Sequence, residues 1–338
     1  MDHSLIEAIV YNLTAPMPLF FVLGIFATLI KSDLKIPDAL YIGLTLYLLA
    51  AIGLKGGAEI QHVGLLSIYL PVMGCLFLGT SIPIAGYYIL RKWGGFNIHD
   101  AAAVAGHYGS VSAVTFVSAT QFLSQLHIAS EGYTSAFLAI FEPTGVITGI
   151  LLARIALQLK DRRENATVSD VNDYSWLKTS LHESLTNTGS LILAGSLVIG
   201  FISGEDGIHV TEAFFGAPFK GILCIFMLEM GLVAGRRLME IKHVGVFLVF
   251  FGILIPLISG FLGVMVGQVT GLSIGGMTLM GVMAASASYI AAPAAMRVSL
   301  PEANPSLYLT ASLGITFPFN IAFGIPIYLW IANHMAVI

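Results

Sequence analysis

The chain has 338 residues, of which 57% are hydrophobic and only 10% are charged, with a mean hydropathy of +0.88 and a formal net charge of −4. Soluble globular proteins have an apolar share near half and a charged share near a quarter. This composition excludes a soluble globular protein and predicts an all-α, polytopic membrane protein. The sequence carries no transition-metal ligand spacing, phosphate-binding loop or nucleic-acid signature, so we expect no cofactor and no nucleic-acid partner.

Apolar runs of about 20 residues, which suffice to cross a hydrocarbon core roughly 30 Å thick, recur along the whole chain. Several of them contain proline or glycine, which a helix bundle tolerates when neighbouring helices satisfy the freed backbone groups. In chain order they predict ten transmembrane helices, at residues 16–31, 36–54, 65–90, 98–123, 132–158, 184–203, 213–235, 242–267, 274–298 and 305–335.

The basic residues divide unequally between the two sides of these ten spans. On one side the loops carry only Lys55 and Lys220, whereas the other side collects most of the remaining Lys and Arg residues: Lys31, Lys35, Arg91, Lys92, Lys160, Arg162, Arg163, Lys178, Arg236, Arg237, Lys242 and Arg297. Cytoplasmic loops are enriched in Lys and Arg. We therefore expect a multi-pass protein of the cytoplasmic (inner) membrane with both termini outside.

Residues 160–180 form the only long polar stretch, and five predicted spans lie on each side of it. This predicts an N-terminal five-helix repeat at residues 1–159, a cytoplasmic linker at 160–180 and a C-terminal five-helix repeat at 181–338. An odd number of spans in each half makes the repeats inverted. Residues 52–57 resemble residues 230–235 at a displacement of 178, and the same displacement relates Ser110 to Ser288.

Small polar residues interrupt the fourth and ninth spans, at residues 106–113 and 285–293. If each helix is broken there, its second half directs a helix N-terminus, with free N–H groups and a partial positive charge, towards the middle of the bilayer. This pattern predicts a site for a small anion, formed by Gly109, Ser110, Val111, Ser112, Ser286, Ala287, Ser288 and Ile290. For either motif alone, the alternative interpretation is a helix packing surface.

Glu142 lies beside Pro143 within the fifth span, where a carboxylate is costly in lipid and marks an ion or proton pathway. Oxygen ligands suit a hard cation, so we predict a Na+ site and no transition-metal site, formed by Glu142, Ser110, Ser288 and Asn320. Alternatively, Glu142 pairs with an internal donor and only holds helices together. His107 is open to two interpretations, a proton relay or substrate donor and a structural histidine.

Three functions remain open on these residues. Sodium-driven anion symport is favoured. A cation/proton exchanger that uses Glu142 would move sodium without an anion, whereas symport makes the two fluxes interdependent. An intramembrane enzyme has little support, because His107 and the serines lack a partner acid at triad-like positions.

Residues 286–297, followed by residues 301–309 and 311–320, resemble the C-terminal hallmark of SbtA-type sodium-dependent bicarbonate transporters. Residues 52–57 and the motif of the fourth span are similar to the first half of that family. The chain departs from the family pattern at His107 and Tyr108, which replace apolar residues, and at Glu142, where an aspartate is expected.

This resemblance implies sodium-coupled import of bicarbonate by an elevator-type alternating-access mechanism. It also implies a homotrimer in which each protomer has a core domain with the broken helices and a gate or scaffold domain. In the family, a PII-like regulator, SbtB, binds the cytoplasmic face. Another small anion remains an alternative substrate, because N–H and hydroxyl groups recognise oxyanions with little chemical selectivity.

Overall fold

The computed structural model describes residues 5–164, 182 and 186–336, and in these residues all regular secondary structure is helical. Six of the described helical segments are long and apolar enough to cross a membrane, and a seventh results if α1 (Leu5–Thr14) and α2 (Pro16–Leu29), bent by 65°, count as one span. The structure thus gives a multi-pass helical membrane protein. Helix length and composition do not show the ten predicted spans, because several of the predicted segments are interrupted or carry charges.

Each predicted segment lies on a helix or an interrupted helix. The first three segments correspond to α2, α3 (Asp38–Val63) and η1 with α4 (Leu65–Ile68 and Tyr69–Lys92). The fourth and fifth correspond to α5 with α6 (Ile98–Gly109 and Ala113–Gln125) and η2 with α7 (Gly132–Ser135 and Ala136–Glu164). The second half contains α9 (Thr188–Phe215), α10 (Phe219–Val244), α11 (Val246–Val269), α12 with α13 (Ile274–Ala285 and Ala291–Ser299) and a final segment that ends with α16 (Ile325–Met335).

Some boundaries differ from the sequence-based prediction. The helix α7 continues to Glu164, into the predicted linker, most of which lies outside the described residues. The helix α9 extends beyond the predicted end at residue 203 and is kinked at Gly204. The positive φ of 59° at this residue is one that glycine adopts readily. The ten-residue α1 was not predicted because it is too short to span a membrane. Its Asn12 side chain donates to the Ile321 carbonyl at 2.6 Å and so anchors α1 to the last segment.

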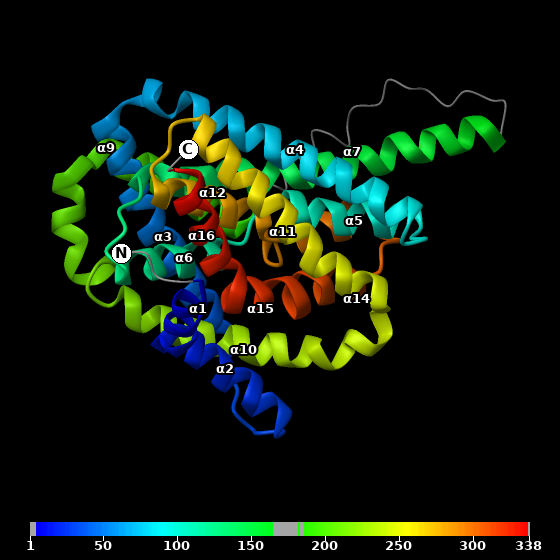
Figure 1. The fold of residues 1–338 in the computed structure, drawn as a ribbon, viewed down its shortest axis with the longest axis horizontal. Helices are drawn as coiled ribbons and strands as arrows, with labels where there is room; N and C mark the ends of the chain where they lie inside the picture. Colours follow the sequence, from blue (N-terminus) through cyan, green and yellow to red (C-terminus); the bar gives the residue numbers. More distant parts are fainter. Residues whose placement is uncertain (1–4, 165–181, 183–185, 337–338) are drawn as a thin grey trace.

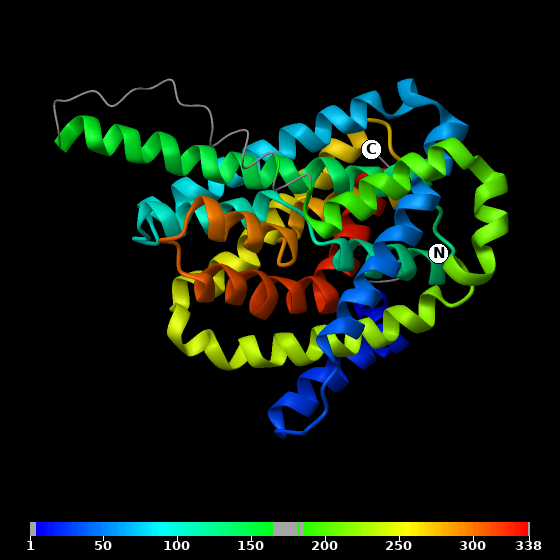
Figure 2. The ribbon, with the colours of Figure 1, turned by 180° about the vertical axis from the view of Figure 1, so that it is seen from behind.

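The interrupted helices lie in the middle of the molecule. In both views, α5, α6 and α12 occupy a central layer, with α4 and α7 on one side and α10 on the other (Figures 1 and 2). The most extensive packing outside this layer joins α3 to α9 and α2 to α10. Glycine permits both contacts, since a Cβ atom at Gly57 would lie 2.0 Å from the Leu197 carbonyl oxygen and one at Gly231 would lie 2.0 Å from the Phe21 carbonyl oxygen.

The last segment is a helix with two widened, π-helical stretches, η3 (Thr310–Thr316) and η4 (Asn320–Gly324). Each is followed by a helical turn that contains a proline, Pro318 in α15 (Phe317–Phe319) and Pro326 in α16. Proline has no backbone N–H and clashes with the preceding turn of a regular helix. The widened turns therefore let an apolar helix with two prolines continue through the bundle.

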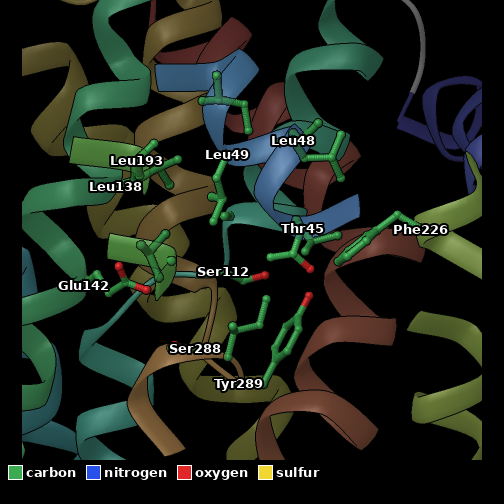
Figure 3. Close-up of a pocket in the computed structure, with 17 residues that line it drawn as sticks. Thr45, Leu48, Leu49, Ser112, Leu138, Glu142, Leu193, Phe226, Ser288 and Tyr289 are labelled. Atoms are coloured by element: carbon green, nitrogen blue, oxygen red, sulfur yellow. The ribbon is translucent and has the colours of Figure 1, made fainter. Parts of the chain in front are cut away.

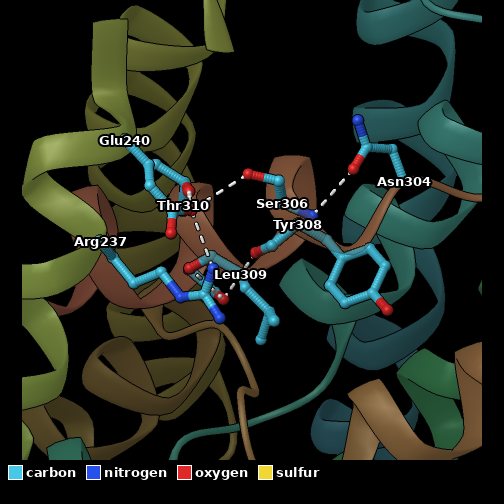
Figure 4. A network of polar contacts seen from close by, with 8 residues as sticks. Arg237, Glu240, Asn304, Ser306, Tyr308, Leu309 and Thr310 are labelled. Atoms are coloured by element: carbon cyan, nitrogen blue, oxygen red, sulfur yellow. Dashed lines mark hydrogen bonds and ion pairs between the residues drawn. The ribbon is translucent and has the colours of Figure 1, made fainter. Parts of the chain in front are cut away.

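A polar network holds the C-terminal end of α10 to α14 (Pro305–Leu309) and the start of η3 (Figure 4). The Glu240 carboxylate accepts from Arg237 at 2.8 Å, from the Ser306 hydroxyl at 3.1 Å and from the Thr310 hydroxyl at 3.3 Å. On the other side of α14, the Asn304 backbone N–H donates to Asp100 Oδ1 at 2.7 Å. These bonds place the last segment between α10 and the start of α5.

Candidate functional site

A pocket lies where the two helix interruptions meet α3, α7, α9 and α10, and it has an empty volume of about 600 Å³, open solvent at its mouth included. Its wall is mostly aliphatic, with Leu48 and Leu49 from α3, Leu138 from α7 and Leu193 from α9 (Figure 3). The polar side chains of the wall are Thr45, Ser112, Glu142, Ser288 and Tyr289. A mostly apolar pocket with a few convergent polar groups is the usual form of a small-ligand site.

The interruption between α5 and α6 exposes the start of α6 to this pocket. Ser112 is the N-cap, and its Oγ accepts from the Thr115 N–H at 3.2 Å and from the Thr115 hydroxyl at 2.9 Å. The N–H of Phe116 donates to the Ser112 carbonyl and begins the helical ladder. The first two N–H groups of α6, on Ala113 and Val114, have no helical partner, and both residues line the pocket.

The interruption between α12 and α13 is built similarly. Ser288 Oγ accepts from the Ala292 N–H at 3.3 Å, in the first turn of α13, and Ser288, Tyr289 and Ile290 line the pocket. Both pocket serines therefore use their oxygen as an acceptor for a helix N-terminus. Within the described residues the Ser288 hydroxyl donates to no protein acceptor, and the Ser112 hydroxyl lies close to that of Tyr289, so both hydroxyls are placed at the pocket.

The two interruptions are bonded directly to each other. The Ser112 N–H donates to Ser286 Oγ at 3.0 Å, and the Ser288 N–H donates to the His107 carbonyl at 2.9 Å. The helices α5 and α12 match at a displacement of 176 residues. Each has 12 residues, and each is followed by a C-cap serine in extended conformation, Ser110 or Ser286. Ser110 therefore corresponds in position to Ser286, and Ser112 to Ser288, which shifts the sequence-based alignment of Ser110 with Ser288 by two residues.

Glu142 comes from the turn of α7 that contains Pro143, and its carboxylate reaches the edge of the pocket (Figure 3). Its Oε2 accepts from the Ser190 hydroxyl at 2.6 Å. Ser190 lies in the first turn of α9, where Asn187 Oδ1 accepts from the Ser190 N–H at 3.0 Å. A helix N-terminus stabilises a nearby negative charge, so α9 provides part of the compensation that a carboxylate in a membrane protein requires.

Five of the predicted site residues line the pocket and five do not. Those in the wall are Val111, Ser112, Glu142, Ser288 and Ile290, whereas Gly109, Ser110, Ser286, Ala287 and Asn320 lie outside it. The residues outside hold the interruptions in place. The Ser110 hydroxyl donates to the Glu142 carbonyl at 3.2 Å, and the Ser286 hydroxyl donates to the Met283 carbonyl at 2.9 Å.

Asn320, which the sequence suggested as a Na+ ligand, is fully buried in the last segment. Its Nδ2 donates to the Ala285 carbonyl at 2.8 Å, and its Oδ1 lies 3.1 Å from the Tyr328 hydroxyl. The Ala285 carbonyl is at the C-terminal end of α12, where helix carbonyls lack intrahelical partners. Asn320 therefore stabilises the interruption of α12 in this conformation.

His107 is also fully buried and lies outside the pocket. Its Nδ1 is 2.6 Å from the Ala103 carbonyl, and its ring stacks on Tyr308 with centroids 4.3 Å apart. Its Nε2 has no partner among the described residues. This placement is that of a structural histidine, and it gives no support to a substrate-donor role.

Thr45, Phe226 and Tyr289 are among the wall residues that sequence reasoning did not name as site residues. The hydroxyls of Thr45 and Tyr289 point towards one another near Ser112, with the Phe226 ring beside them (Figure 3). The buried Tyr289 hydroxyl has no hydrogen-bond partner among the described residues. A buried polar atom without a partner is unusual in proteins, and in a pocket wall it is a candidate ligand contact. In the sequence, Thr45 is a polar residue within an apolar stretch of α3, and this pattern is the local signal that could have indicated it as a wall residue.

Chemically, the pocket offers two serine hydroxyls, a tyrosine hydroxyl and the N–H groups at the start of α6. Donors of this kind, together with a helix N-terminus, bind oxyanions. The Glu142 carboxylate at the edge is the single acidic side chain of the wall and suits a cation. The pocket can thus hold an anion and a cation close together.

The family model of the Na+-dependent bicarbonate transporter superfamily matches residues 16–333, which is nearly the whole chain. A comparison with curated proteins gives no significant match. The match covers both interruptions, Glu142 and the complete wall of the pocket.

Proposed function

Since the chain belongs to the Na+-dependent bicarbonate transporter superfamily, a family of transporters and not of enzymes, we propose that it imports bicarbonate together with Na+ through the pocket at the two helix interruptions. The observation that carries this proposal is the arrangement of the two pocket serines. Each oxygen already accepts from a helix N–H, and both hydroxyls lie at the pocket. An anion needs such donors, whereas a cation needs oxygen acceptors.

The proposed anion site consists of Ser112, Ser288, Tyr289 and the N–H groups of Ala113 and Val114. The residues Gly109, Ser110, Ser286 and Ala287 act from behind the wall by holding the interruptions open. Val111 and Ile290 contribute apolar surface beside the serines. Bicarbonate, with three oxygens, can accept from several of these donors at once.

The proposed Na+ site is centred on the Glu142 carboxylate, with Ser288 across the same pocket. Ser110 belongs to it through its bond to the Glu142 backbone, and Asn320 contributes by fixing the end of α12. Moving an anion into a cell with a negative interior costs about 2.3 kcal/mol per 100 mV. A co-transported Na+ cancels that charge and adds the energy of its own gradient.

The proposed architecture is a pair of inverted repeats, residues 1–159 and 181–338, joined by the linker 160–180. The helix pairs support it, because exchanging equivalent helices of the two halves converts the α3–α9 contact into the α10–α2 contact. The pocket lies between the interrupted helices and the set α3, α9 and α10. This position fits an elevator-type mechanism in which a core domain carries the ligands past a gate domain.

The remaining features follow the family resemblance and the charge distribution. We place the basic ends of α4, α7 and α10, which lie at the same end of the bundle (Figure 1), in the cytoplasm and both termini outside the inner membrane. A homotrimer and a PII-like regulator of the SbtB type on the cytoplasmic face complete the proposal.

The test is uptake of labelled inorganic carbon into proteoliposomes at alkaline pH, where bicarbonate dominates, with an inward gradient of Na+ or of K+. We expect uptake with Na+ alone. Parallel measurements of labelled Na+ separate the alternatives, because symport requires bicarbonate for Na+ entry, whereas an exchanger using Glu142 moves Na+ without it. Absence of uptake by folded protein with either cation would contradict bicarbonate symport and direct the test to other small anions.

A further inference from the structure

A second pocket lies beside the first and shares two wall residues with it, Ile52 of α3 and Val117 of α6. Its empty volume is about 610 Å³, open solvent included. The rest of its wall comes from α3, α6, the start of α10, the η2 turn and the residues before η2. In the proposed orientation this is the outer side of the first pocket, because η2 follows the outer end of α6.

Lys55 is the one basic residue in the wall of this second pocket. It is exposed, and within the described part of the chain it forms no hydrogen bond or ion pair. The next residue, Gly56, brings α3 close to η2, since a Cβ atom there would lie within 1.7 Å of Ser135 Oγ. The close approach of the Ser135 side chain to Gly56 thus places the backbone of Lys55 beside the η2 turn.

Three hydroxyl groups of the wall already have hydrogen-bond partners within the protein. The hydroxyls of Thr120, Thr134 and Ser135 donate to backbone carbonyls, at 3.0, 2.7 and 3.2 Å. Gln121 Oε1, by contrast, is buried without a partner, so this side-chain amide has unused hydrogen-bonding capacity in the wall.

Two acidic residues lie near Lys55. Glu131, in the wall, accepts from the Ser273 N–H at 2.7 Å and from the Ser273 hydroxyl at 3.0 Å, so its charge faces the N-terminus of α12. Glu59 lies one helical turn after Lys55 and contacts Gly132, and it is not in the wall. The ammonium of Lys55 is therefore the single positive charge of the wall, and among the described residues it has no ion-pair partner.

We propose that this second pocket is an entry site for small anions, in which Lys55 holds the anion before it passes Ile52 and Val117 into the first pocket. The direction of transport in this inference rests on the proposed function. The attraction of anions to the second pocket rests on the geometry alone. A single ammonium with few fixed donors gives weak, reversible binding, which suits an entry site. Charge in a cleft raises the local concentration of counter-ions and the rate of their association.

The first experiment measures bicarbonate uptake by Lys55→Gln at low ionic strength. We expect KM to rise about three- to tenfold with kcat little changed, and Lys55→Arg to restore the wild-type KM. Lys220→Gln is the matched control, because Lys220 is an exposed lysine at the start of α10 that is absent from the pocket wall. Glu59→Gln should change KM in the opposite direction, because it removes a nearby negative charge.

The second experiment does not depend on transport. Thr120→Cys places a thiol in the pocket wall, in a background with Cys75→Ala and Cys224→Ala. The rates at which this thiol reacts with an anionic and with a cationic thiosulfonate measure the local electrostatic potential. We expect Lys55→Gln to lower the anionic-to-cationic rate ratio about fivefold, as for a unit charge roughly 8 Å away in water. Lys220→Gln should leave the ratio unchanged.

An unchanged rate ratio in Lys55→Gln would overturn the entry site, whatever the fate of uptake. An unchanged KM in an actively transporting Lys55→Gln would overturn it equally. If the wild type takes up no bicarbonate, the proposed function fails, and the rate ratio still decides whether this pocket attracts anions.

Discussion

At the scale of single residues, the serines of the two interruptions have different tasks although the sequence presents them alike. Ser112 and Ser288 line the pocket, whereas Ser110 and Ser286 donate to backbone carbonyls. Their division follows from the acceptors that packing supplies, since the Glu142 carbonyl lies within reach of Ser110 and the Met283 carbonyl within reach of Ser286. The pocket serine of each motif is three residues after the last residue of its first helix.

Ser112→Ala and Ser288→Ala should each raise the KM for bicarbonate about tenfold or more, because a hydrogen bond to a charged group contributes about 1.5–3 kcal/mol. Initial uptake rates over a range of bicarbonate concentrations measure this change. Ser118→Ala is the control, since Ser118 is buried on α6, is absent from the pocket wall and donates to the Val114 carbonyl of its own helix. Wild-type KM values in the two pocket variants would remove these hydroxyls from the site.

Glu142→Gln should raise the Na+ concentration needed for half-maximal uptake about tenfold or abolish the Na+ dependence, because the amide keeps an acceptor for Ser190 and loses the charge. Ser190→Ala separates the two interpretations of Glu142. It removes the hydrogen bond and keeps the carboxylate, so its Na+ dependence should stay close to that of the wild type. If the two variants instead show equal effects, Glu142 holds helices together and does not bind Na+.

At the scale of elements, close contacts between backbones hold the interrupted helices in place. The helix α7 lies against the end of α5 at Gly145, where a Cβ atom would be 2.0 Å from the Gly109 carbonyl carbon and 2.1 Å from the Ser110 nitrogen. Such an approach needs glycine, because a side chain there meets backbone atoms that cannot move aside. The same helix carries Glu142, so this contact also sets the distance between Glu142 and the α5–α6 interruption.

Gly145→Ala should therefore displace α7 from the interruption, lower the stability of the protein by about 1–3 kcal/mol or more and abolish uptake. The thermal unfolding midpoint in detergent and the uptake rate measure the two effects. Gly195→Ala on α9 is the matched control, since a Cβ atom at Gly195 meets no atom within 4 Å. Equal midpoints and rates for the two variants would contradict a close contact at Gly145.

At the scale of the whole molecule, the C-terminal ends of α4, α7 and α10 share one end of the bundle (Figure 1), and basic residues are found at each of them. The network around Glu240 also lies at this end and joins α10 to the last segment (Figure 4). An end rich in Lys and Arg faces the cytoplasm. On this basis we expect this end to be cytoplasmic, which would place the second pocket on the outer side of the first.

Single cysteines test this orientation in a background with Cys75→Ala and Cys224→Ala. Lys220→Cys should react with a membrane-impermeant maleimide in intact cells, whereas Lys92→Cys should react only after permeabilisation, because both positions are exposed and lie at opposite ends of the bundle, at the start of α10 and the end of α4. Fluorescence of the labelled protein on a gel measures the difference. The reverse pattern would place the termini in the cytoplasm.

The sequence by itself determined the class of the protein and the places where two helices are interrupted, and it singled out Glu142, which lies in the pocket wall. These properties are local, since hydropathy, serine caps and a carboxylate beside proline act within a few residues. The family followed from the same residues, and the match over residues 16–333 confirms it. Inverted repeats, ten spans and the trimer stay predictions.

Only the tertiary structure decided which predicted residues meet in one pocket. Ser190 lies 48 residues from Glu142, and the bond from Ser112 to Ser286 joins positions 174 residues apart. No local pattern encodes such pairs, because they depend on how α9 packs on α7 and how the two interruptions interlock. The structure places Thr45, Phe226 and Tyr289 in the wall and Asn320 outside it for the same reason. The packing of distant helices determines which side chains face the same space.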